Sequence, residues 1–428
     1  MPLTSFIADQ RIYFIDLNEL TGLITIFRRF EFPSETLRWL LAGSLLAFLA
    51  SFGQTFFISV FAGDIRQAFG LSHGQWGLIY TLGTTASATV MIWSGGLTDR
   101  FRVRVLGTAT LGCLALACIA MAWTPSVAVL FTAIFALRLA GQGMTMQIAL
   151  VAMSRWFTAS RGKAISIANL GGSAGEAILP LLFAALMLHY HWKSLWLLAS
   201  VMILIGIPVL IWLLRNERAV QHWAKGEESF GIAARHWTRN QAFCHWLFWF
   251  MVPALTGMAA FNTAFFFHQV HFAAVKDWPH VELVALFPGY IVFVVGATVV
   301  SGWLMDKTSA AQMMPWIQLP LVICFTLLAY ADTLIDAAFV LFFMALTVGA
   351  NSVVTNAFWA EVYGTRHLGS IKAMAAATIV FGSAVGPGIS GFLVDQGLGL
   401  EAQFRAAAFF FLGTTVLVKI GIRGALNS

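Results

Sequence analysis

The chain has 428 residues, of which 59% are hydrophobic and only 10% carry a charge. Soluble domains carry about 25% charged residues, so this sequence has too little charge to cover a surface that faces water. The composition excludes an ordinary soluble enzyme, a disordered chain and a nucleic-acid-binding protein. The formal net charge of +6 is therefore informative through the positions of the basic residues along the chain.

The four cysteines lie in apolar segments, without a Cys-x-x-Cys pair and without the spacing of metal ligands. Their expected role is that of small buried hydrophobic side chains. We expect no metal site and no cofactor. The sequence also lacks the Gly-rich phosphate-binding motif that would indicate direct use of ATP.

Twelve apolar segments follow one another along the chain, and each approaches the roughly 20 residues that a membrane-spanning helix needs. A polar stretch at 215–240 separates them into two sets of six. We therefore predict an all-α integral membrane protein with a cytoplasmic N-terminal segment at 1–37, a six-helix bundle at 38–214, a cytoplasmic linker at 215–240 and a second six-helix bundle at 241–428. The predicted spans are 39–61, 74–94, 105–123, 127–149, 164–188, 195–214, 242–267, 283–302, 313–329, 337–359, 371–394 and 402–422.

The basic residues are distributed unevenly between the two sides that this span count defines. Twenty of the 25 Lys and Arg residues fall on the side of the N-terminus, the linker and the C-terminus, four fall on the other side, and Arg138 lies inside a span. Because loops rich in Lys and Arg stay in the cytoplasm, we expect both termini to be cytoplasmic. The chain is expected to be a multi-pass protein of the cell membrane.

The two halves of the sequence are related by a single shift of 207 positions, which places Gly95 on Gly302 and Asp99 on Asp306. One shift without gaps that matches several separate positions predicts two related six-helix bundles in parallel. Transporters built in this way have their binding site at the interface between the bundles. The shift also places Gly162 on Gly369, Gly175 on Gly382 and Pro180 on Pro387.

Three motifs of the first half resemble motifs of the major facilitator superfamily. The segment 95–100 (Gly-Gly-Leu-Thr-Asp-Arg) resembles the family's signature loop between helices two and three, and the segment 138–143 (Arg-Leu-Ala-Gly-Gln-Gly) resembles its helix-four motif. The segment 155–164 resembles the loop before helix five in the monocarboxylate and oxalate–formate branch. The resemblance implies the major facilitator fold and a transporter closest in its loops to that branch.

The signature loop and its repeat predict a cytoplasmic gate. Asp99 can accept hydrogen bonds at the N-terminus of a neighbouring helix, where the helix dipole favours an anion. Arg100 can pair with an acidic residue of the other bundle such as Glu361. The alternative is a tight turn whose cations only set the topology. The residues assigned to the gate are Gly95, Asp99, Arg100, Asp306, Lys307 and Glu361.

Two charged residues lie deep within predicted spans. Arg138 is near the middle of the fourth span, where an arginine costs at least about 2.5–3.5 kcal/mol to insert. We expect it to anchor an anionic or hydrogen-bond-accepting substrate; the alternatives are a structural ion pair or a cap on backbone carbonyls. Glu176, in the fifth span, is expected to carry a coupled proton, and the alternative is a structural hydrogen bond, to Arg138 among others.

Several uncharged polar side chains also lie within spans and are expected to face the interior, because polar groups avoid lipid. Gln142, Asn262, Asn351 and Thr355 are therefore assigned with Arg138 to the substrate-binding site. His268 is assigned with Glu176 to proton coupling, because histidine titrates in the physiological range. The alternative for His268 is an interfacial histidine that is simply hydrated.

These features predict a secondary active transporter of a small organic solute, with an organic anion or carboxylate favoured, that works by alternating access and is driven by protons. An alternative of the same class exports drug-like compounds in exchange for protons. An alternative of another class is a membrane sensor that transports nothing. The expected partners are a small-molecule substrate, a proton and the lipid bilayer, and the chain is expected to be a monomer, not an enzyme.

Overall fold

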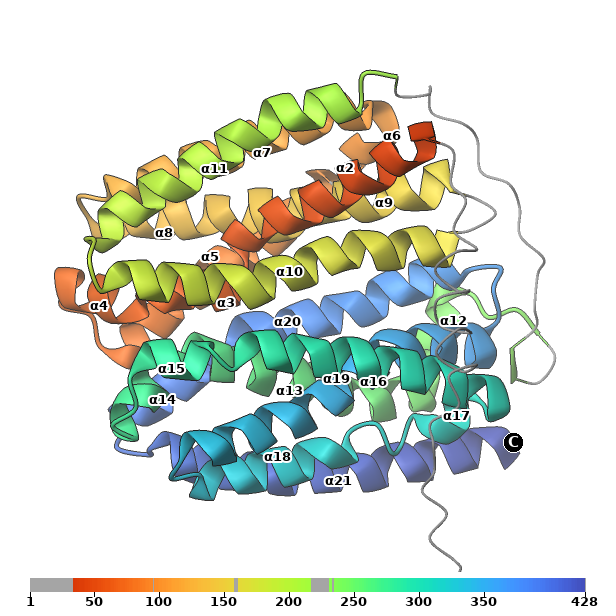
Figure 1. Cartoon of the computed structure of the whole chain (residues 1–428). Coiled ribbons are helices and arrows are strands. Elements are labelled where there is room, and N and C mark those ends of the chain that lie inside the picture. The colour runs from red at the N-terminus through yellow and green to blue at the C-terminus, as the bar shows by residue number, and fades with distance from the viewer. Residues whose placement is uncertain (1–33, 95, 158–160, 217–230, 233–234, 428) are drawn as a thin grey trace, which may run out of the picture.

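The computed structural model describes residues 34–94, 96–157, 161–216, 231–232 and 235–427. All regular elements within these residues are helical. Figure 1 shows the helices of the first half of the chain above those of the second half. Most of the predicted segment at 1–37 and much of the linker at 215–240 lie outside the described residues, so the predicted domain boundaries there stay a prediction.

Nine helices among the described residues are long and apolar enough to cross a bilayer. A helix can satisfy its backbone hydrogen bonds within itself, which a chain in lipid requires. In the first half they are α7 (Val103–Ala122), the continuous helix of α8 (Val127–Leu137), η3 (Arg138–Thr145) and α9 (Met146–Trp156), α10 (Arg161–Met187) and α11 (Trp192–Leu213). In the second half they are α13 (Trp246–Phe267), α15 with α16 (His280–Val284 and Phe287–Lys307), α19 (Leu334–Tyr363), α20 (Leu368–Asp395) and α21 (Leu400–Asn427).

The first predicted span is a broken helix rather than a straight one. Its two parts, Leu37–Gly53 and Thr55–Phe69, are bent by 46°. Gly53 lies so close to the fourth span that a Cβ on it would be 2.2 Å from the carbonyl oxygen of Leu137. The helix therefore breaks where two backbones touch. The elements of this region are α2 (Ser34–Ala50), η1 (Ser51–Gly53), α3 (Thr55–Ile58), η2 (Ser59–Phe61) and α4 (Ala62–Phe69).

Two further helices occupy the remaining predicted spans. The first, α5 (His73–Ser94), has 22 residues but many Gly, Ser and Thr side chains, which lower its hydropathy. The second, α18 (Leu319–Tyr330), has only 12 residues. It is short because a turn at 314–318 separates it from α17 (Ala310–Met313), and proline near that turn cannot continue a helix. The other short helices are α6 (Leu97–Arg100), α12 (Arg239–Cys244) and α14 (Gln269–Val275).

The two halves of the chain meet along α5 with α20 and along α10 with α16. Glycines bring the first pair into backbone contact, because a Cβ on Gly77 would lie 2.7 Å from the carbonyl oxygen of Pro387. Gln269 of the second half donates hydrogen bonds to the carbonyl of Phe56 (3.2 Å) and the hydroxyl of Ser59 (2.8 Å) in the first half. These contacts lie toward the end that holds α4 and α14, opposite the C-terminus (Figure 1). We call it the far end.

Candidate functional site

Arg138 lies in a buried position at the start of a π-helical segment, η3, in the middle of the fourth span. Its side chain is 1% exposed. Its Nη1 donates a hydrogen bond to the carbonyl of Gly53 (3.1 Å) and another to the hydroxyl of Thr55 (3.4 Å). The break in the first span explains this contact, because a helix end leaves backbone carbonyls without partners inside the helix.

Tyr80 of α5 completes the surroundings of this arginine. The guanidinium carbon of Arg138 lies 5.2 Å from the centre of the Tyr80 ring, a distance at which a cation is attracted to an aromatic face. The hydroxyl groups of Tyr80 and Thr55 form a 2.5 Å hydrogen bond. The Nε of Arg138 is buried and has no hydrogen-bond partner among the described residues. The sequence pattern did not single out Tyr80, Thr55 or Gly53, since no local pattern connects them to Arg138, from which Gly53 is separated by 85 positions.

Glu176 lies on α10, away from Arg138. No ion pair joins the two residues in the part of the chain that the structure describes. The helix that carries Glu176, α10, packs against α16 of the other half. Glycines before Glu176 let α10 approach α2, since a Cβ on Gly171 would lie 2.0 Å from the carbonyl oxygen of Ser44. Glu176 thus lies on a helix that packs both within its own half and against the other half.

The predicted polar residues of the cavity lie in separate local contacts. Thr355 donates a 2.6 Å hydrogen bond to the Oδ1 of Asn351 on the same helix. The Oδ1 of Asn262 is buried without a hydrogen-bond partner among the described residues. Gln142 is partly buried within η3, about one π-helical turn after Arg138. No described hydrogen bond joins these four side chains to Arg138.

His268 lies at the far end among other histidines. It is 3% exposed, and its Nε2 lies 3.3 Å from the carbonyl oxygen of Pro387. The ring of His73, from the first half, lies 6.0 Å from that of His268 and 3.9 Å from that of His271. The sequence predicted a proton-coupling role for His268, with a hydrated interfacial histidine as the alternative; the structure places it, buried, in the contact between the halves.

The predicted cytoplasmic gate is described only in part. Gly95 and the side chains of Asp99 and Asp306 lie outside the described residues. Glu361 accepts a hydrogen bond of 2.8 Å from the backbone N–H of Ala310 at the start of α17. The carboxylate therefore binds within its own half in this conformation, while Arg100 is exposed. Lys307, the other gate cation, lies 3.8 Å from the ring centre of Trp303.

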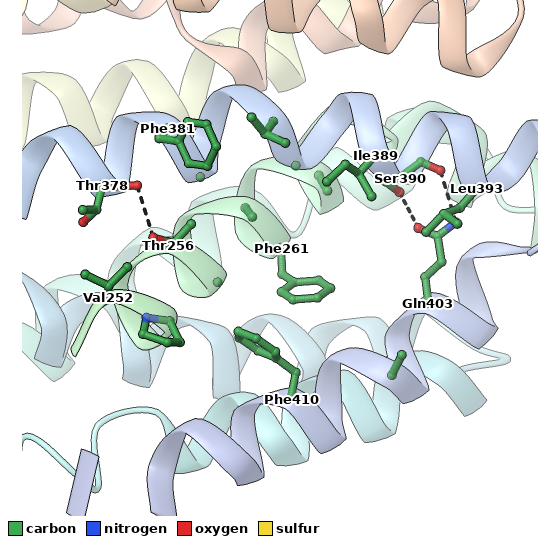
Figure 2. A pocket seen from close by; sticks show the side chains of 18 of the residues that line it. Val252, Thr256, Phe261, Thr378, Phe381, Ile389, Ser390, Leu393, Gln403 and Phe410 are labelled. Carbon is green, nitrogen blue, oxygen red and sulfur yellow. Dashed lines mark hydrogen bonds between the residues drawn. The ribbon is translucent and has the colours of Figure 1, made fainter. Parts of the chain in front are cut away.

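A cavity of about 770 Å³ lies elsewhere, between α13, α20 and α21 (Figure 2). Its lining is mostly aliphatic and aromatic. Several of its polar side chains already have hydrogen-bond partners within the protein: the hydroxyl of Thr256 donates to the backbone carbonyl of Thr378 (3.5 Å), and that of Ser390 donates to the side chain of Gln403 (2.6 Å). None of the residues predicted to bind substrate lines this cavity. Its chemistry suits lipid or another apolar molecule rather than an anion.

Comparison with known proteins identifies the family. The Major Facilitator Superfamily model matches residues 43–347. A crystal structure of a bacterial homologue of the human lysosomal transporter Spinster, inward-facing and unoccupied, has a TM-score of 0.71 at 17% identity and covers 92% of this chain and 98% of that chain. The nucleoside transporter NupG has a TM-score of 0.67 at 12% identity, with coverages of 92% and 100%. No curated protein matches the chain.

At such low identities the structural similarities show the fold alone. The finer resemblance to the monocarboxylate and oxalate–formate branch stays a prediction. The family match spans most of the first half and continues well into the second, and the helical fold agrees with it. The chain therefore belongs to the Major Facilitator Superfamily of membrane transporters.

Proposed function

We propose that this protein is a secondary active transporter that carries a small organic anion together with protons by alternating access. The proposal rests on the surroundings of the Arg138 side chain. It is buried, it contacts neutral groups, and no carboxylate among the described residues pairs with it.

A buried cation without a counter-ion is costly, and a substrate anion is the group that would offset this cost. The guanidinium presents its N–H groups in a planar fork that fits two carboxylate oxygens. One N–H, at Nε, has no described partner. The contacts to Gly53 and Thr55 hold the side chain at a fixed orientation, so little rotamer entropy remains to be lost when an anion binds.

Glu176 is our candidate for the coupled proton. In support of this role, Glu176 lies on α10, which packs against α16 of the other half, and alternating access would change such a contact between the halves. A carboxylate that moves between a buried and a hydrated setting changes its proton affinity. Because Glu176 and Arg138 form no ion pair, the proton and the anion would bind at separate places.

The orientation in the membrane supports an inward-facing assignment for this conformation. If the positive-inside rule holds, both termini lie in the cytoplasm and the far end faces the outside. The contacts of Gln269 with Phe56 and Ser59 then close the outer side. A substrate would leave this conformation toward the cytoplasm.

The first test is a ligand screen followed by transport. Purified protein is heated with small carboxylates, sugars, nucleosides and lipophilic cations, and compounds that raise the melting temperature are then tested as labelled substrates in proteoliposomes. We expect carboxylates to stabilise the protein. Arg138→Gln should abolish this stabilisation and the uptake, whereas Arg405→Gln, which removes an exposed arginine of α21, should leave both intact. Stabilisation by lipophilic cations instead would favour an exporter, and binding without uptake would favour a sensor.

The second test concerns protons. Uptake of the stabilising anion is measured with and without an imposed pH gradient. We expect the gradient to accelerate uptake in the wild type and to have no effect in Glu176→Gln, which cannot ionise. Equal rates with and without the gradient in the wild type would contradict proton coupling and leave the role of Arg138 open.

A further inference from the structure

The last residue of α20, Asp395, binds the first turn of α5 across the seam between the two halves. Its carboxylate accepts hydrogen bonds from the hydroxyl of Ser72 (2.6 Å) and from the backbone N–H groups of Gly74 (2.8 Å) and His73 (3.1 Å). The N–H groups of a first helical turn have no partner within the helix, and the helix dipole favours an anion there. Asp395 thus caps a helix that belongs to the other half.

Close packing follows this cap along both helices. A Cβ on Gly74 would lie 2.6 Å from the Oδ2 of Asp395, and a Cβ on Gly391 would lie 2.4 Å from the carbonyl oxygen of His73. Two turns further along α5, the hydroxyl of Thr81 donates a 2.7 Å hydrogen bond to the carbonyl of Ala384. The cap fits only when α5 and α20 are in this backbone contact, because the N–H groups of Gly74 and His73 cannot reach across a gap.

We propose that Asp395 is an interhelical latch that holds the far end closed and that it must release for this end to open. Its carboxylate is on the water-exposed side of the contact. Water can therefore replace the N–H donors when the latch opens, so no charge is left buried without partners. A contact of this kind can stabilise one conformation and still be reversible.

The second seam between the halves has no counterpart of Asp395 at the matching position of the sequence. The shift of 207 positions that relates the two halves places Asp395 on Leu188, which cannot accept a hydrogen bond through its side chain. The equivalent contact at the far end lies between α10 and α15. Loss of the latch should therefore open the α5–α20 seam and leave the α10–α15 packing in place.

Distance measurements between spin labels test the latch without any substrate. The labels are attached at Gln67→Cys on α4 and Ala274→Cys on α14, two exposed positions at the far end of opposite halves, after the four native cysteines are replaced. We expect one short distance in the parent protein. In Asp395→Ala a longer distance should appear, with a roughly tenfold rise in the ratio of open to closed populations, the effect of losing about one charge-assisted hydrogen bond.

Three variants make the result specific. Ser72→Ala, which removes one of the three donors, should shift the populations in the same direction but less. Asp395→Asn keeps the size of the side chain, so it should show the shift even if the alanine variant folds poorly. Glu282→Gln removes another exposed carboxylate at the far end, on α15, and should change nothing.

An unchanged distance distribution in both Asp395 variants would overturn the latch, and so would an equal shift in Glu282→Gln, because the effect would then be one of net charge. The inference goes beyond the proposed anion transport and does not depend on it. Failure of the ligand screen would leave the distance measurement intact, and the reverse also holds.

Discussion

Tyr80 links Arg138 to the contact between the two halves of the protein. Its ring centre lies 5.2 Å from the guanidinium carbon of Arg138 and 4.7 Å from the ring centre of Phe267 in the other half. Tyr80 is fully buried, so it cannot move without disturbing one of these neighbours. A change at Tyr80 caused by an anion bound to Arg138 would therefore also be felt at its contact with Phe267 across the seam.

Substitutions of Tyr80 distinguish the contribution of its ring to anion binding from the contribution of its hydroxyl. Tyr80→Phe keeps the ring over Arg138 but removes the hydrogen bond to Thr55; we expect a weakening of anion binding of about tenfold or less, the range of one hydrogen bond. Tyr80→Leu also removes the aromatic face and should weaken binding further. Both are measured as the dissociation constant of the stabilising anion. Equal affinities in all three proteins would contradict a positioning role for Tyr80.

A substitution can also distinguish the role of the charge of Arg138 in anion binding from the role of its planar shape. Arg138→Lys keeps the positive charge but loses the planar fork and the stacking surface. We expect it to retain weak anion binding, about 10- to 100-fold below the wild type, because hydrogen bonds to charged groups contribute about 1.5–3 kcal/mol. Full affinity in the lysine variant would show that charge alone is recognised.

The break in the first span depends on a contact between two backbones. Gly53→Ala would place a Cβ 2.2 Å from the carbonyl oxygen of Leu137, and neither backbone can give way easily. We expect a loss of about 1–3 kcal/mol, the usual cost of overpacking, seen as a lower melting temperature. Gly112→Ala is the matched control, because a Cβ there would meet no described atom within 4 Å. Equal melting temperatures for the two variants would argue against the contact.

Acidification is expected to weaken the closure of the far end through His271. Burial, and next the nearby Arg66 guanidinium, lower the pKa of His271. The other titratable groups that face this cluster are His73 from α5, His268 from the end of α13 and Asp395 from α20. A lowered pKa means that the closed form binds the proton less tightly than an opened form, in which the pKa returns toward about 6.5.

Closure should therefore be complete well above pH 6.5 and should weaken as the pH falls below about 6.5. The spin labels on α4 and α14 measure this as a growing longer-distance population between pH 8 and pH 5. His271→Gln should reduce the pH dependence. His189→Gln, an exposed histidine outside the cluster, should leave it unchanged. A distance distribution that does not depend on pH would contradict the role of His271.

Much of the architecture could be predicted from the sequence. The apolar segments near 20 residues long determine membrane-spanning helices, because lipid offers no partner for an open backbone. The position of Arg138 within such a segment also singled it out, since a charge there is too costly to be incidental. Hydropathy alone, however, did not indicate the break that the structure shows in the first helix at Gly53 and Gln54.

The tertiary structure decided which groups surround each charge. Gly53 lies 85 positions from Arg138, and Ser72 lies 323 positions from Asp395, and no local pattern connects such pairs. Hydropathy indicates that a segment crosses the membrane but not how the helix is rotated or where two helices touch. Where two helices touch depends on glycines that let a neighbouring helix come close. Gly53 plays this part beside Arg138, and Gly74 plays it beside Asp395. The sequence by itself therefore determines the membrane-spanning helices and the place of Arg138 within one of them, while the packing of those helices decides which groups surround it.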